Sequence, residues 1–341
     1  MKISWCVRAA GWALVLGFFA PTYSQGNALS QKTEYDKAIL AFQKQLENKQ
    51  QEVQQKSGGF RDPGLPFILT HGRPTRYSVL LLHGLSDSAY FMRDLADVLF
   101  KQGYNVVVPL LSGNGTDYTD LQKITLEDWT KDVDFGVEVA SGLGSEVIVG
   151  GLSAGGALAV DSARRHQDKV RGILLFSPAL SFQKKTSRLS CLYKSGYVAG
   201  KLRDVPIRYQ KISNNGVCEL FHLVQKLDLS PARPQYSIPL FAVLTEYDDV
   251  IKVQWTIDWI EGQKSQENRI LAYTFPSGKS RLRFKNLGQA DIIPTQEIRH
   301  AQVTRKTNEY NDEWNPKFDG MERALSGFMA RAFPLSIRSV K

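Results

Sequence analysis

The pentapeptide Gly151-Leu152-Ser153-Ala154-Gly155 constrains the fold more than any other feature of this sequence. It follows an apolar stretch at 147–150 that is typical of a buried strand, and small residues at 157–160 favour a helix after it. A serine on so sharp a strand-to-helix turn needs neighbours without bulky side chains, which the glycines provide. The turn would expose the serine hydroxyl and direct a helix N-terminus at it, which favours developing negative charge. The alternative is an ordinary glycine-rich connection between a strand and a helix.

The surrounding sequence predicts an α/β fold in which strands and helices alternate. Uninterrupted apolar runs predict strands over 77–82, 104–109, 146–150, 170–176 and 239–244. Between and after them, helical patterns cover 94–102, 126–140, 154–165, 253–261 and 318–332. This order predicts a mostly parallel central sheet with helices on both faces. Two further strands, over 270–275 and 281–284, are expected around a turn at Ser277-Gly278.

Two segments depart from the alternation. Residues 31–56 predict an amphipathic helix outside the main fold, which would either pack on the main domain or serve as a partner-binding stalk. Residues 182–237 show no repeating pattern and are interpreted as a cap inserted over the edge of the sheet. The predicted organisation is therefore a signal peptide at 1–24, a helical extension at 25–59, a core in two parts at 60–181 and 238–341, and the cap between them.

The N-terminus has the features of a secretory signal peptide. Lys2 and Arg8 precede and flank a short apolar run, and Thr22 and Ser24 are small residues at the −3 and −1 positions of a cleavage after Ser24. We therefore expect export to the periplasm or the medium, with a retained N-terminal membrane anchor as the alternative. In an oxidising compartment Cys191 and Cys218 can form a disulfide. In the chain-entropy model, such a bond adds roughly 3–4 kcal/mol to the free energy of unfolding. The alternative is two buried thiols, and the spacing matches no zinc or redox motif.

A serine hydroxyl is a weak nucleophile until a base accepts its proton. In α/β folds with a serine at such a turn, the triad runs in the order serine, acid, histidine, which selects His300 among the five histidines. The acid should directly follow a strand between the two, where Asp248 is preferred and Asp249 and Glu246 remain alternatives. The backbone N–H groups of Leu85, after a strand ending in His83-Gly84, and of Ala154 are the candidate oxyanion donors.

These motifs resemble the bacterial carboxylesterase, monoacylglycerol lipase and lysophospholipase group of the α/β-hydrolase fold. The resemblance rests on residues 80–85, 104–109, 151–156 and 248–250, and it covers about 78–178 and 239–300. It implies that Asp248 is the acid, that the insertion is a cap shaping an acyl pocket, and that no cofactor or metal is needed. Three features depart from the group: Gly113-Asn114-Gly115 replaces a common Gly-His-Gly, Thr245 replaces a common glycine, and the separation between Asp248 and His300 is unusually long.

The sequence therefore predicts a serine hydrolase that cleaves a small-molecule or lipid carboxylic ester through an acyl-enzyme on Ser153. A peptidase or amidase on the same fold and a catalytically inactive binding protein are the alternatives. The formal net charge of +9 is spread among acidic residues, without an arginine-rich tract, so no nucleic-acid partner is expected. Peripheral contact with an anionic membrane is a minor expectation.

Overall fold

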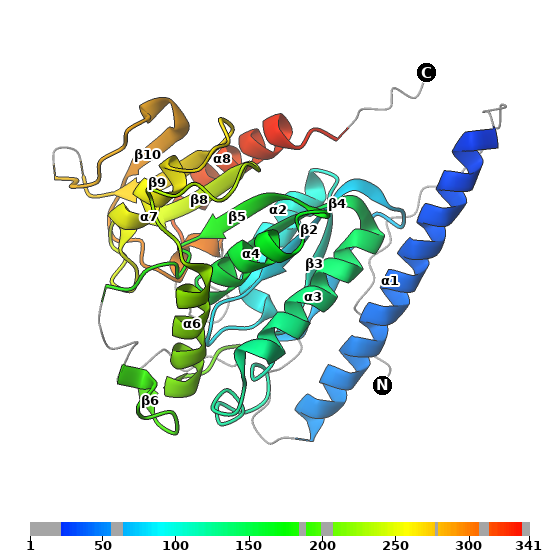
Figure 1. Cartoon of the computed structure of the whole chain (residues 1–341), viewed down its shortest axis with the longest axis horizontal. Helices are drawn as coiled ribbons and strands as arrows, with labels where there is room; N and C mark the ends of the chain where they lie inside the picture. The colour runs from blue at the N-terminus through cyan, green and yellow to red at the C-terminus, as the bar shows by residue number, and fades with distance from the viewer. Residues whose placement is uncertain are drawn as a thin grey trace.

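The computed structural model describes residues 22–55, 64–183, 189–198, 207–276, 279–306 and 314–335. In this part of the chain, eight strands form one sheet in the order β1-β3-β2-β4-β5-β8-β9-β10 (Figure 1). The edge strand β1 pairs antiparallel with β3, and all other neighbours pair in parallel. The strands are β1 (Phe67–Leu69), β2 (Thr75–Leu82), β3 (Asn105–Val108), β4 (Gly144–Leu152), β5 (Val170–Phe176), β8 (Leu240–Thr245), β9 (Arg269–Thr274) and β10 (Ala290–Pro294).

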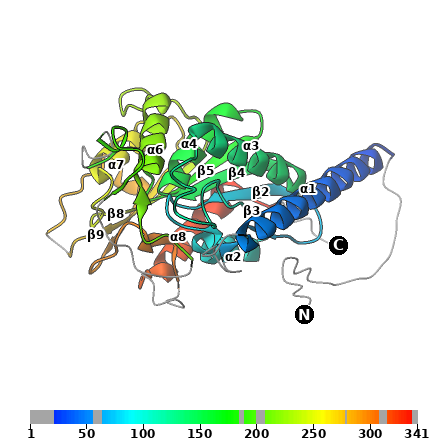
Figure 2. The same ribbon diagram turned by 90° about the horizontal axis from the view of Figure 1, so that it is seen from below.

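The central strands are apolar on both sides because helices cover both faces of the sheet. On β2, Leu80 and Leu82 contribute to the core beneath α3 (Leu126–Leu143) and α4 (Ala154–Arg165), while Val79 and Leu81 contribute to the core beneath α2 (Arg93–Lys101) and α8 (Phe318–Ala332). All four side chains are fully buried. Successive residues of a strand point to opposite faces, so a continuous apolar run is what a doubly covered strand requires. Figure 2 shows α3, α4 and α7 (Val253–Glu261) on one side and α8 and α2 on the other.

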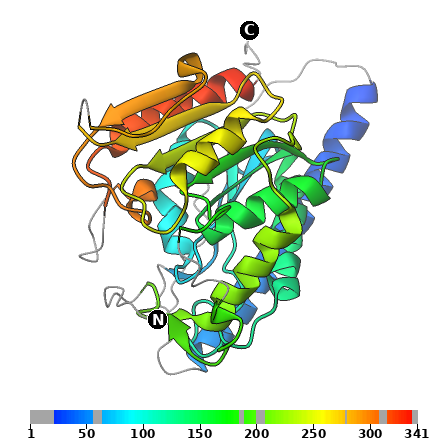
Figure 3. The same cartoon turned by 60° about the vertical axis from the view of Figure 1, so that its left-hand side comes forward.

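The N-terminal helix α1 (Thr22–Gln54) lies along the outside of α3 (Figures 1 and 3). Its buried side chains, Tyr35, Ala38, Phe42 and Leu46, recur at helical spacing. A Cβ on Gly142 of α3 would touch α1 at Ala38 and at the backbone of Glu34, so the absence of a side chain there permits the close approach. The helix begins earlier than the predicted 31–56 and packs on the main domain.

The segment between β5 and β8 forms a separate layer beyond the end of the sheet. Its described residues contain the two-stranded pair β6 (Tyr197–Val198) and β7 (Ile212–Ser213) and the helix α6 (Asn214–Leu227). Figure 3 shows α6 and this strand pair at the lower end of the molecule, and α6 contacts α4 and α3. A bridge between Phe182 and Ile251 joins the start of the segment to the loop after β8.

Most predicted elements are present to within a few residues, and the strand predicted over 270–275 is β9, but the strand predicted over 281–284 is wrong. The stretch 279–286 is irregular, and the next strand is β10, which pairs in parallel with β9 after the short helix η3 (Leu287–Gln289). The amides of Arg281 and Arg283 donate instead to side chains, those of Glu246 and Gln254, at 2.6 and 2.8 Å. The alternating pattern of 281–284 thus reflects two apolar side chains packed on the core rather than a strand, and the turn at Ser277-Gly278 lies outside the described residues.

Two short helices complete the described elements, η2 (Ala89–Met92) and η4 (Gln302–Thr304). The predicted signal peptide lies almost wholly outside the described residues. Among the helices that are described, none combines the length and the apolar character needed to span a bilayer.

Candidate active site

Ser153 lies at the turn between β4 and α4 with φ 53° and ψ −113°, a conformation that a residue with a side chain adopts only under constraint. The constraint comes from β5 and the segment after it: the Ser153 amide donates to the Phe176 carbonyl at 3.0 Å, and its carbonyl accepts from Ala179 at 2.9 Å. Gly155 is equally confined, because a Cβ there would collide with the backbone carbonyls of Leu82 and His83. The glycine motif therefore reflects close contact between α4 and the end of β2.

The structure brings His300 and Asp248 to Ser153 from distant parts of the chain. His300 Nε2 lies 2.8 Å from Ser153 Oγ, and His300 Nδ1 lies 2.6 Å from Asp248 Oδ2. His300 is on the loop after β10, and Asp248 is on the loop after β8. The side chain of His300 is 13% exposed and that of Asp248 is fully buried, so water screens their interaction poorly. The arrangement forms a continuous hydrogen-bonded chain from carboxylate to hydroxyl.

The contacts of the neighbouring acids distinguish them from Asp248. Besides His300, Asp248 accepts hydrogen bonds through Oδ1 from the amides of Val250 and Ile251, at 2.9 and 3.0 Å. Glu246 accepts from backbone amides in the segment after β9 instead. Asp249 is exposed and contributes to His300 only through its charge. Of the three predicted candidates, Asp248 alone has a hydrogen bond to His300 in the described structure.

The surroundings of His300 favour its protonated form. Burial by itself would lower the pKa of the imidazole, but the charge of Asp248 and its hydrogen bond outweigh burial, so the pKa of His300 lies above its ordinary value. The charges of Asp87 and Asp249 raise it further. An imidazole with a raised pKa is a stronger base toward the serine hydroxyl once it is neutral.

The loop that carries His300 is tied to the strand that carries the acid. Thr245, where the related group commonly has glycine, donates its hydroxyl proton to the carbonyl of Ile298 at 2.5 Å. Tyr247 donates from its hydroxyl to the carbonyl of Thr295 at 2.8 Å. Two side chains from the end of β8 therefore fix the path of the loop just before His300.

The turn after β2 borders the serine. A Cβ on Gly84 would lie 3.7 Å from Ser153 Cβ, so the backbone that leads to Leu85 passes directly beside Ser153. In the described structure no backbone carbonyl accepts from the Leu85 amide, and the Ala154 amide begins α4. His83 lies below the turn: it accepts from the Leu111 amide at Nε2 and donates to the Gly84 carbonyl from Nδ1, and burial lowers the pKa of its imidazole. Gly84, which precedes Leu85, and Ala154 therefore both border Ser153.

Four polar residues near the site were not assigned a role from the sequence: Asp87, Asn114, Arg208 and Tyr209. All are buried, and all contact the turn after β2 or the loop 113–116 that packs on it. Asn114 occupies the centre of the Gly-Asn-Gly that departs from the related group. This departure is the one feature of the sequence that could have drawn attention to Asn114. Arg208 and Tyr209 belong to the patternless insertion, where no periodicity could identify them.

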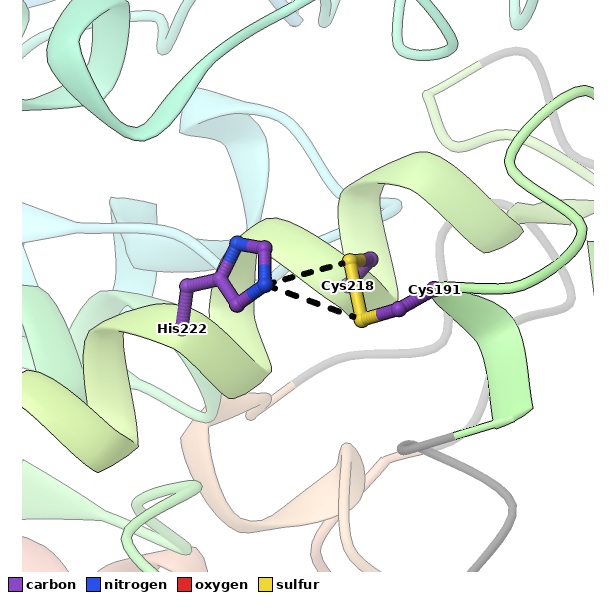
Figure 4. A group of neighbouring side chains, drawn as sticks. All are labelled: Cys191, Cys218 and His222. Atoms are coloured by element: carbon purple, nitrogen blue, oxygen red, sulfur yellow. Dashed lines mark hydrogen bonds between the residues drawn. A yellow bond between two sulfur atoms is a disulfide. The ribbon is translucent and has the colours of Figure 1, made fainter.

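The two cysteines of the insertion lie together. The sulfurs of Cys191 and Cys218 are at bonding distance, and His222 Nε2 lies 3.9 and 3.7 Å from them (Figure 4). These three side chains form the only cluster with metal-ligand potential among the described residues. A metal requires deprotonated thiols, so sulfurs bonded to each other would not ligate one.

Sequence comparisons find similar proteins among hydrolases. A family model described as serine aminopeptidase, S33, matches residues 73–203. A thermostable monoacylglycerol lipase from Bacillus sp. (strain H-257) is 37% identical over 115 residues, which span 34% of this chain and 44% of the lipase. Phospholipase YtpA from Bacillus subtilis (strain 168) is 22% identical over 212 residues, 55% of this chain and 82% of that protein.

Comparisons of the structure show the same fold. A structure from a study of the metagenome-derived lipolytic enzymes LipS and LipT matches with a TM-score of 0.59 at 20% identity, covering 79% of this chain and 98% of the other. A monoacylglycerol lipase from Paleococcus ferrophilus matches with a TM-score of 0.54 at 17% identity, covering 78% and 99%. The sheet order, the strained serine turn and these matches lead to one conclusion: the chain has the α/β-hydrolase fold, and its sequence is similar to those of a bacterial monoacylglycerol lipase and a bacterial phospholipase.

Proposed function

We propose that the protein is a serine hydrolase that cleaves carboxylic esters through an acyl-enzyme on Ser153. Ser153 Oγ attacks the ester carbonyl while its proton passes to His300 Nε2, and Asp248 holds the imidazole in the tautomer that can accept it. The amides of Leu85 and Ala154 stabilise the oxyanion, and His300 returns the proton to the departing alcohol. Water then attacks the acyl group with the same assistance from His300.

The observation that carries this proposal is the unbroken hydrogen-bonded chain from Asp248 through His300 to Ser153. The strained backbone of Ser153 adds to this support, because a positive φ is costly for a residue with a side chain and such strain is common at active sites. The relatives named as lipases and phospholipases support an ester as the bond cleaved.

The apolar side chains of Leu85 and Leu121, which meet α6 at Gly216, support a substrate with an apolar acyl chain. A Cβ on Gly216, in the first turn of α6, would lie 3.0 Å from Leu85 Cδ1 and 3.2 Å from Leu121 Cγ. An insertion helix therefore meets apolar side chains of the core next to the proposed oxyanion donor. We propose a monoacylglycerol or a lysophospholipid, or a simpler ester with an apolar acyl chain, as the substrate class.

Two alternatives remain in view. The match to a family model described as serine aminopeptidase favours amide hydrolysis as the second candidate, and an ester and an amide with the same acyl group would separate the two activities. An inactive binding protein would show neither activity and would not react with a fluorophosphonate probe.

The test is a series of p-nitrophenyl esters of increasing acyl length, measured with the wild type and with Ser153→Ala. We expect hydrolysis that depends on Ser153 and a maximum in the series that reports the size of the acyl pocket. Equal rates from the two proteins would contradict the proposal. Fluorophosphonate labelling of the wild type, but not of Ser153→Ala, provides an independent measurement of serine reactivity.

We also propose that the chain is exported and carries a disulfide between Cys191 and Cys218. The charged and apolar pattern of the first 24 residues supports export, and the distance between the two sulfurs supports the bond. The intact mass of the secreted protein, with and without reduction, tests both: cleavage after Ser24 and a gain of two protons on reduction are expected. Contact with an anionic membrane is tested by sedimentation with vesicles that contain phosphatidylglycerol.

A further inference from the structure

The segment Gly84–Ser88, here called the oxyanion loop, contains the Leu85 amide and is held by residues from two other parts of the chain. Asn114 donates from Nδ2 to the carbonyls of Leu85 and Asp87, both at 2.9 Å. The amide of Tyr209 donates to the carbonyl of Ser86 at 2.8 Å. Three consecutive carbonyls of the loop are therefore hydrogen-bonded to groups outside it, which limits how the peptide planes can rotate.

The insertion reaches this loop through Ile207, Arg208 and Tyr209, which are all buried. The Tyr209 hydroxyl donates to the carbonyl of Gly113 and accepts from the amide of Thr116, so the same segment also holds the loop that presents Asn114. Arg208 lies over the ring of Phe91 at 4.8 Å, and its guanidinium donates to Asp87 Oδ1 at 2.8 Å. The insertion therefore contributes to the framework around Ser153 through its contacts with these two loops.

The pair between Arg208 and Asp87 is buried, with side chains that are 6% and 5% exposed. It lies next to the reacting groups: a Cβ on Gly84 would collide with Asp87 Oδ2 and would lie 3.7 Å from Ser153 Cβ. Gly84 is thus the residue that separates this carboxylate from the nucleophile. A buried charge in this position must be balanced, since removing one partner of such a pair leaves the other uncompensated.

We propose that Arg208 and Asp87 are positioning residues: their ion pair holds the oxyanion loop in its active shape and balances a negative charge beside His300. The proposal rests on the ester hydrolase function above. A pair that only stabilised the fold could lie anywhere in the core, whereas this one joins the insertion to the loop with the proposed oxyanion donor. The exposed pair Arg233–Asp228 on the insertion has no contact with the oxyanion loop among the described residues, and it serves as the matched control.

The charges around His300 give the proposal a signature in the pH profile. The charges that act on it are those of Asp248 and Asp249 from the loop after β8 and of Asp87 from the oxyanion loop, while Glu297 and Arg299 on its own loop pair with each other. All three aspartates favour the imidazolium. Asp87→Asn should therefore move the acidic limb of the kcat/KM profile to lower pH. Arg208→Gln removes a balancing positive charge and should move it to higher pH, and the double variant should return it toward the wild type.

The experiment measures kcat, KM and the pH profile for a short-chain p-nitrophenyl ester with the wild type, Arg208→Gln, Asp87→Asn, the double variant and the control Arg233→Gln. We expect Arg208→Gln to lower kcat about tenfold or more with little change in KM, because a displaced oxyanion donor weakens transition-state binding. The control should match the wild type. Thermal unfolding identifies any variant that fails to fold, and Arg208→Lys, which keeps the charge, then takes the place of Arg208→Gln and is expected to keep the wild-type pH limb while lowering kcat.

Two results would overturn the proposal: an unmoved pH limb with wild-type kcat in every folded variant, or a shift of both single variants in the same direction. The wild type and Ser153→Ala are measured first under the same conditions. If the wild type shows no hydrolysis that depends on Ser153, the proposed function fails. If it is active but the ion-pair variants behave like the control, the positioning role alone fails.

Discussion

Replacing Asp248 with asparagine should remove most of the catalytic rate while leaving the fold intact. The structure gives the reason: Oδ1 of Asp248 accepts from the amides of Val250 and Ile251, and an asparagine Oδ1 can keep both bonds. The Nδ2 group would then face His300 Nδ1 and donate to it. The imidazole would carry its proton on Nε2, directed at Ser153, and could no longer accept the serine proton.

The expected magnitude is a fall in kcat of about 10³–10⁴-fold, which corresponds to roughly 4–5.5 kcal/mol of transition-state stabilisation. The acidic limb of the profile should also move to lower pH, because Asp248 is the main group that raises the pKa of His300. As the imidazole must be neutral to act as base, a lower pKa keeps it neutral at lower pH.

The assay is steady-state hydrolysis of a p-nitrophenyl ester from pH 5 to 9, with thermal unfolding to confirm the fold. Asp249→Asn is the matched control, because its side chain is exposed and has no hydrogen bond to His300 among the described contacts. The reasoning is refuted if Asp248→Asn keeps more than about a tenth of the wild-type kcat, or if Asp249→Asn loses as much as Asp248→Asn.

Three further predictions concern the surrounding framework. Gly155→Ala should lower kcat about 100-fold or more, because the added Cβ would displace the end of β2 and the serine turn. The measurement is kcat, with circular dichroism to confirm that the variant folds, and an unchanged kcat would contradict this packing argument. Thr245→Val should lose the hydrogen bond to the Ile298 carbonyl, which should lower the free energy of unfolding in urea by about 1–3 kcal/mol and also lower kcat. Thr245→Ser keeps the hydroxyl and should retain the stability and the kcat of the wild type. If the disulfide forms, Cys191→Ser should lower the free energy of unfolding by roughly 2–4 kcal/mol, measured by urea denaturation. The variant should then be as stable as the wild type kept in a reductant.

Local sequence was enough to predict the elements that surround the nucleophile. The bounds of α4, α7 and α8 and of β5 agree with those expected. A doubly covered parallel sheet requires continuous apolar strands, and the helices that cover it repeat their apolar residues at helical spacing. The prediction of a strand over 281–284 is wrong because local sequence does not show which groups a backbone amide will reach. The alternation in this segment is real, but its amides are satisfied by Glu246 and Gln254, and only the folded chain brings those side chains within reach.

The same division holds for the site. The strained serine turn is encoded in five consecutive residues, since glycine alone tolerates the contacts of so tight a connection. The order of residues along the chain sufficed to propose His300 and Asp248. The distances between these side chains, and the hydrogen bonds by which Asn114 and Arg208 hold the oxyanion loop, depended on contacts between segments far apart in the chain. Such contacts leave no periodic signal in the sequence, because each is made by a single side chain whose partner is set by the packing of the whole domain.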